Sequence, residues 1–147
     1  MDFINEIVNK KYNTDRGWLY LVDLIRERFP YLHINEEGLA NLQIVSLSEE
    51  EFRATGFVGE YVASKNQLRI LERASDFDVT FTEEEILETF LHELIHVLTS
   101  KYLPDQDMIL EGFNMRRVSD KTSSFFLGLN EGVTQFIVNN LLNLLYP

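Results

Sequence analysis

The decisive stretch of this sequence is Glu88–Ser100, ETFLHELIHVLTS, in which polar residues interrupt a strongly apolar segment. The apolar residues follow the spacing of a buried helical face, so the histidines and the glutamate among them need polar partners. His92 and His96 stand four residues apart, which places them on one face of a helix, one turn from each other. Glu93 then lies on the adjoining face.

Two imidazoles with this spacing can bind one metal ion, and Glu93 can then accept a proton from a water beside that ion. The chain has three histidines and no cysteine, so any metal site must be built from His, Asp and Glu. The pattern therefore predicts a Zn²⁺ site with a general base. The alternative is that both histidines are satisfied core residues of an amphipathic helix.

A catalytic zinc site needs a third protein ligand and an open position. The candidates elsewhere in the chain are His33, Asp105, Asp107, Glu111 and Glu131. The histidine lies far upstream, and the two aspartates follow the HELIH helix too closely to fold back onto it. Glu131 is favoured over Glu111, because it opens a helix that can pack against the first one and present the carboxylate rigidly. Its alternative role is an ordinary acid in the first turn of a helix.

The rest of the chain predicts one α+β domain over residues 1–147, without repeats or linkers. A first helix is expected over residues 14–29, with Thr14 as its N-cap and Pro30 beyond its end. A strand is expected in residues 41–48, and Ser48 then caps a short helix. Residues 57–72 predict a hairpin around a polar SKNQ turn, in which Gly56 and Gly59 indicate a bulge or a close approach.

Two further helices are expected downstream. Thr82 and Glu85 form a capping box, from which the HELIH helix should run to about Tyr102. A last helix should begin at about Asn130, and Gly132 would let it approach the HELIH helix closely. Its predicted packing residues are Val133, Phe136, Ile137, Leu141 and Leu144. The segment 107–129 between these helices is expected to be a rim loop or a small hairpin.

The composition narrows the class of partner. The formal net charge of −11 argues against nucleic acid and against anionic membrane surfaces. The first residues, MDFINEIVNKKYN, lack the pattern of a signal peptide, and no apolar run reaches the length of a membrane span. The expectation is a cytoplasmic protein, or a secreted one if the chain has been trimmed from a longer precursor.

HELIH followed by LNEGVTQ at residues 129–135 resembles the gluzincin metallopeptidases, the zincins whose third zinc ligand is a glutamate. Thermolysin-like proteases and the aminopeptidases with an Asn-Glu-Gly segment belong to this group. The resemblance covers these two short motifs and the order of elements between residues 57 and 145, and it implies a zincin-like fold in a minimal, single-domain form. It also implies Zn²⁺ held by His92, His96 and Glu131, with Glu93 as general base, and a peptide or protein substrate.

The resemblance further implies that an edge strand of the 57–72 hairpin pairs with extended substrate. Thermolysin-like enzymes orient one zinc histidine with an aspartate, where this chain has Gln135. Asn130 and Thr134 are candidates for additional bonds around the ligands. The His or Tyr that larger members supply to the oxyanion from a following subdomain is missing at its usual place. Candidates within this chain are Tyr61, Tyr102, Arg116 and Arg117.

Three hypotheses follow. The first is a zinc-dependent peptidase. The second is a catalytically weak or inactive zinc-binding scaffold that acts as a regulatory or peptide-binding module, with a neighbouring domain or partner chain at the cleft edge. The third is a structural helical protein in which HELIH has arisen by accident.

Overall fold

The computed structural model describes residues 2–71, 73–74, 79–106, 108–111, 114–117 and 127–145. The predicted α+β class is confirmed over these residues. The helices are α1 (Asp2–Tyr12), α2 (Leu19–Arg28), α3 (Glu36–Ala40), α4 (Glu49–Thr55), α5 (Glu83–Thr99) and α6 (Leu127–Leu145), with short 3-10 turns at Ala63–Lys65 and Pro104–Gln106. The strands are β1 (Gln43–Ser46), β2 (Gly59–Val62), β3 (Gln67–Ile70), β4 (Arg73–Ala74), β5 (Val79–Thr80), β6 (Ser100–Leu103), β7 (Met108–Glu111) and β8 (Asn114–Arg117).

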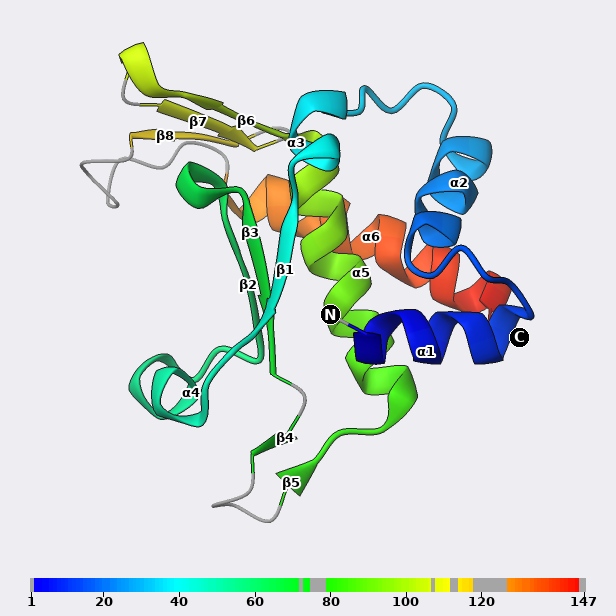
Figure 1. Ribbon diagram of the computed structural model, residues 1–147. Coiled ribbons are helices and arrows are strands. Elements are labelled where there is room, and N and C mark those ends of the chain that lie inside the picture. The colour runs from blue at the N-terminus through cyan, green and yellow to red at the C-terminus, as the bar shows by residue number, and fades with distance from the viewer. Residues whose placement is uncertain are drawn as a thin grey trace.

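Helix α5 carries the HELIH motif and runs through the middle of the molecule (Figure 1). The predicted capping box is confirmed, because Thr82 Oγ1 accepts the Glu85 N–H at 3.1 Å and Glu85 Oε2 accepts the Thr82 N–H at 3.0 Å. The expected end near Tyr102 is wrong. The helix stops at Thr99, and Ser100 adopts extended backbone and begins β6.

A three-stranded mixed sheet, in the order β1-β3-β2, lies on one side of α5 (Figure 1). The predicted hairpin is confirmed as β2 and β3, which pair antiparallel, whereas β1 pairs with β3 in parallel. Strand β2 is therefore an edge strand, and both β2 and β3 contact α5. Gly59 shows the predicted close approach, since a Cβ there would come within 2.5 Å of Thr89 Cγ2. Gly56 instead ends α4 in the left-handed conformation, with φ of 72°.

The hydrophobic core surrounds α5, with α1, α2 and α6 on the side away from the sheet (Figure 1). Buried residues of five elements form one cluster: Ile4, Ile7 and Val8 of α1, Leu21, Val22 and Ile25 of α2, Leu68 and Ile70 of β3, Leu87, Phe90, Leu91, Leu94, Ile95 and Leu98 of α5, and Ile137, Val138 and Leu141 of α6. Burial on both sides explains why apolar residues of α5 lie on more than one of its faces.

The first predicted helix is shorter than expected. Helix α2 begins at Leu19, and Thr14 is not its N-cap, because the Thr14 hydroxyl accepts the Arg16 N–H within a preceding turn. Helix α1, which was not predicted, supplies the missing acceptors. Its Asn9 and Asn5 side chains accept the backbone N–H groups of Gly17 and Trp18.

The last helix also differs from its prediction. It begins at Leu127, so Glu131 lies in its second turn rather than its first. Gly132 is exposed and a Cβ there would meet no described atom within 4 Å, so its predicted role in close helix approach is wrong. Ile137 and Leu141 are buried as predicted, but Phe136 is 65% exposed. The side chain of Leu144 lies outside the described residues.

The segment after α5 contains the predicted small hairpin, formed by β7 and β8. Strand β6 pairs with β7 and extends this hairpin to a three-stranded sheet. Residues 118–126 lie outside the described part of the chain. None of the helices in the described ranges is both long enough and apolar enough to cross a membrane.

Candidate metal centre

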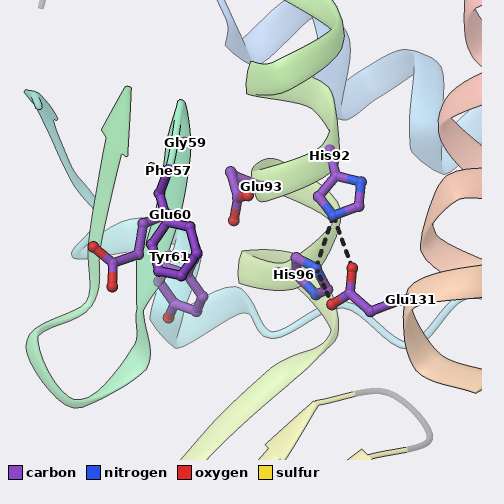
Figure 2. A pocket seen from close by; sticks show the side chains of 8 residues that line it. All are labelled: Phe57, Gly59, Glu60, Tyr61, His92, Glu93, His96 and Glu131. Atoms are coloured by element: carbon purple, nitrogen blue, oxygen red, sulfur yellow. Dashed lines mark hydrogen bonds and ion pairs between the residues drawn. The ribbon is translucent and has the colours of Figure 1, made fainter. Parts of the chain in front are cut away.

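Three side chains from two helices meet at one point (Figure 2). His92 Nε2 lies 3.1 Å from Glu131 Oε2, and His96 Nε2 lies 3.1 Å from Glu131 Oε1. The two Nε2 atoms are 3.2 Å apart. The structure thus brings together the two predicted histidines and the favoured third candidate, and this group can hold a metal ion.

The helices fix this convergence. His92 and His96 project from successive turns of α5, with ring centroids 4.9 Å apart, while Glu131 reaches them from α6. His96 is only 9% exposed, whereas the side chain of Glu131 is 46% exposed. The hydrogen bond from His96 lowers the pKa of the Glu131 carboxyl, which keeps that group ionised and suited to bind a cation.

Glu93 lies beside the triad and points toward strand β2 (Figure 2). A Cβ built on Gly59 would lie 2.5 Å from Thr89 Cγ2 and 3.3 Å from Glu93 Cγ, so a larger residue here would have to displace the Thr89 side chain or the strand. Burial raises the pKa of Glu93, His96 and His92 oppose that rise, and Glu131 and Glu60 add to it. A carboxylate whose pKa is raised in a cleft is suited to act as a general base.

Gln135 takes the position next to His92 that the sequence predicted for it. Its Oε1 lies 3.1 Å from His92 Nδ1, and its Nε2 donates to Asn139 Oδ1 at 2.9 Å. Because the Asn139 oxygen can only accept, it holds the amide of Gln135 with Oε1 toward the ring. Gln135 Oε1 can only accept a hydrogen bond, so His92 Nδ1 must carry the proton. In the neutral ring Nε2 then has a lone pair, which is directed at the triad.

A cavity of about 300 Å³ opens beside the triad. Phe57 and residues 59–61 of strand β2 form the opposite wall, with Phe57 and Tyr61 facing the ligands across the space (Figure 2). A second cavity of about 180 Å³ shares Gly59, His92 and Glu93 with the first. The two cavities therefore adjoin at Gly59, His92 and Glu93.

The predicted oxyanion donors are only partly accounted for. Tyr61 lines the cavity, but its hydroxyl donates to Asn66 Oδ1 at 2.8 Å. For Arg116 and Arg117 the structure describes the backbone in β8, and for Tyr102 the backbone in β6; their side chains lie outside the described residues. No donor to an oxyanion is thus identified among the described side chains.

The remaining candidates also find their places. Thr134 is buried on α6, with no bond to either histidine among the described contacts, and the side chain of Asn130 is not described. His33 lines a separate cavity, and Asp105 is exposed in the turn after β6. Asp107 and the side chain of Glu111 lie outside the described residues. Among the described residues, the group that could hold a metal ion consists of His92, His96 and Glu131.

Two residues of the site were missed from the sequence. Asn139 stands four residues after Gln135, a spacing at which amide side chains of one helix meet. This hydrogen bond could therefore have been predicted from the sequence. Phe57 carried no such signal, because its exposure depends on how α4 and β2 are joined. No protein-family model, curated protein or solved structure matches this chain, so its function must be argued from the site itself.

Proposed function

We propose that this protein is a zinc-dependent metallopeptidase of the gluzincin type, built on a zincin-like fold. The single observation that supports the proposal most strongly is the convergence of His92, His96 and Glu131 beside a buried glutamate and an open cavity. Motif and geometry agree here, although the ligands come from helices that are far apart in the sequence.

The donor set fits zinc. Two imidazole nitrogens and one carboxylate form the ligand set of many catalytic zinc sites. In a tetrahedral site with bonds of about 2.0–2.1 Å, neighbouring ligand atoms lie roughly 3.3 Å apart. The distances of 3.1, 3.1 and 3.2 Å within this triad are close to that value. Magnesium and calcium prefer all-oxygen ligands, which two histidines do not provide.

The chain's own residues suit peptide hydrolysis. When bound, zinc would act as a Lewis acid that acidifies water and polarises a carbonyl group. Glu93 would accept a proton from the attacking water and return it to the leaving nitrogen. Gln135 would hold His92 in the tautomer that leaves Nε2 available to the ion. The cavity between α5 and β2 would hold the scissile bond.

Strand β2 would bind the substrate. It is an edge strand that contacts α5, and its residues Gly59–Tyr61 line the metal cavity. An extended peptide can add to such an edge through backbone hydrogen bonds. An unfolded segment has backbone groups free to form these bonds, whereas those of a folded segment are already paired. The proposed substrate is therefore an extended peptide or an unfolded stretch of protein.

A peptide-binding module without turnover is the second candidate, and one observation favours it. The Tyr61 hydroxyl is directed to Asn66, so the cavity lacks an identified donor for a tetrahedral oxyanion among the described side chains. Such a donor is typically worth roughly 10²–10³ in turnover. Zinc would then have a structural role, and the cleft would hold a peptide without cleaving it.

Substitution of Glu93 separates these candidates. Glu93→Gln removes the base but none of the three ligands, so we expect unchanged zinc stoichiometry and a fall in peptide cleavage of about 10²–10⁴-fold. The assay is digestion of a broad peptide library, followed by mass spectrometry, with and without chelator. Zinc binding by a parent protein that cleaves no peptide would exclude the peptidase and leave the module.

A further inference from the structure

Two exposed apolar side chains stand at the entrance to β2. Phe57 is 51% exposed and borders the cavity that contains the triad, while Val58 is 36% exposed and borders the smaller cavity next to it. Burial of such a side chain is favourable, because it removes apolar surface from water. An aromatic ring left half-exposed beside a polar site therefore presents apolar surface that a ligand can cover.

The turn that carries Phe57 is held in place by hydrogen bonds. The Thr55 hydroxyl donates to the Glu51 carbonyl at 2.8 Å and accepts the Phe57 N–H at 3.2 Å. Gly56, in the left-handed conformation, donates its N–H to the Phe52 carbonyl at 2.7 Å. Hydrogen bonds thus fix the backbone that carries the Phe57 ring. A residue that selects among ligands needs such a fixed position.

The edge of β2 places a bound peptide next to this ring. The Leu71 N–H donates to the Val58 carbonyl at 2.9 Å, so Val58 belongs to a hydrogen-bonded pair of the β2–β3 ladder. In an antiparallel ladder the next residue directs its N–H and C=O the other way. The backbone groups of Gly59 therefore point toward the outer edge of β2, two residues from Phe57 and directly beside Glu93.

Charge restricts the side chain that this cavity can take. Its lining includes the carboxylates Glu60, Glu93 and Glu131, and no lysine or arginine among the described residues. An acidic side chain would be repelled there, whereas an apolar one would gain contact with the phenyl ring of Phe57. A volume of about 300 Å³ is at the lower end for a ligand pocket, so it suits one large side chain beside the peptide bond.

We infer that the cleft selects extended peptides with a large apolar or aromatic side chain next to the bond over the metal site, and that Phe57 is the residue that makes this selection. The inference deepens the proposed function and depends on it for the position of the bond. Phe57 is a specificity-determining residue here, because its ring would touch the substrate and take no part in the proton transfers.

Two zinc-chelating peptide hydroxamates test this selection without turnover. One carries a benzyl side chain next to the hydroxamate group and the other carries a methyl group. We expect the zinc-loaded protein to bind the benzyl compound at least about tenfold more tightly, the lower end for a difference of this kind in an apolar pocket. Phe57→Ala should bring the ratio of the two affinities close to one, and Phe57→Leu should keep part of it.

Phe136→Ala is the matched control, because Phe136 is 65% exposed but lines neither cavity, so this variant should keep the full ratio. An unchanged ratio in Phe57→Ala, or a ratio near one in the parent, would overturn the inference while leaving the peptidase proposal intact. The expected ratios without cleavage of any peptide would contradict the peptidase but support selection by Phe57. If the parent binds neither hydroxamate, both fail.

Discussion

Two well-separated cavities among the described residues, one beside the His92 triad and one beside His33, each contain histidine and glutamate, yet only the first brings candidate metal-binding atoms together. The cavity of the candidate metal centre has a volume of about 300 Å³, and its lining includes His92, His96 and Glu131. The other cavity, of about 220 Å³, is lined by His33 and two glutamates, Glu36 and Glu37. By composition alone, each is a possible site.

The difference lies in the elements that carry the side chains. The metal centre is built on helices of 17 and 19 residues that pack against each other in the core. In the other cavity the histidine lies in a loop and the two glutamates lie in α3, a helix of five residues, while the end of α5 and the start of β6 complete the lining. Arg26 binds Glu36 at 2.7 and 2.8 Å, and this hydrogen bond lowers the pKa of the Glu36 carboxyl while neutralising its charge. Convergence on rigid elements, without a competing cation, distinguishes the metal centre.

The largest expected effect comes from removing a ligand. Loss of a residue that only hydrogen-bonds to a metal ligand lowers metal affinity by up to about 100-fold. His96→Ala removes a ligand itself, so it should weaken zinc binding by more than that. His33→Ala should leave the zinc affinity unchanged. Competition with a fluorescent chelator measures both. Equal losses of zinc affinity in the two variants would mean that the two cavities do not differ in their contribution to zinc binding.

Zinc should also stabilise the folded protein, since the triad joins α5 to α6. At a free zinc concentration 100 times the dissociation constant, a ligand specific for the native state adds about 2.7 kcal/mol to the free energy of unfolding. Urea unfolding with zinc and with chelator tests this value, and His92→Ala should show no difference between the two conditions. A parent protein indifferent to zinc would speak against a site that links the two helices.

Gln135 offers the next effect. Gln135→Leu removes the acceptor of the His92 Nδ1 proton and should lower zinc affinity by about 10–100-fold. Asn139→Ala should lower it only about twofold, because a pair of side chains four residues apart on a helix contributes roughly 0.2–0.5 kcal/mol. Asn140→Ala, on the same helix but bonded to Arg28, is the control. Retention of full affinity in Gln135→Leu would mean that the ring needs no such support.

Arg26→Gln gives the smallest effect and sharpens the comparison most. This exposed ion pair is screened by solvent and contributes little to stability, so the protein should remain folded. If convergence decides where metal binds, freeing Glu36 beside His33 creates no second site, and the zinc stoichiometry stays at one. A second equivalent of zinc in this variant would show that the His33 cavity fails to bind zinc because Arg26 neutralises the Glu36 carboxylate, and not because of its geometry.

Much of the metal centre could be predicted because its signals are local. The spacing of His92 and His96 defines one helix face, and the Thr82 capping box fixes where that helix begins. The role of Glu131 was harder to predict from the sequence, because only the assumption that two apolar helices pack together connects this residue to the HELIH motif. The prediction for Gly132 failed at this same step: an apolar pattern shows that a helix is buried but not which residues lie at the crossing.

The features that were missed depend on distant parts of the chain. Asn5 and Asn9 accept the first N–H groups around α2, so no local cap marked where that helix begins. The Asn35 side chain donates to the Ser100 carbonyl at 2.6 Å, across 65 residues, where α5 gives way to β6. Local propensity carries no information about such pairs, because their partners are chosen by tertiary packing.

The most direct test of the central claim is a crystal structure of the zinc-soaked protein with anomalous diffraction measured at the zinc absorption edge. The account predicts one anomalous peak, bounded by His92 Nε2, His96 Nε2 and a Glu131 carboxylate oxygen at about 2.0–2.2 Å. A peak at His33 instead, or no peak at the triad at saturating zinc, would contradict it.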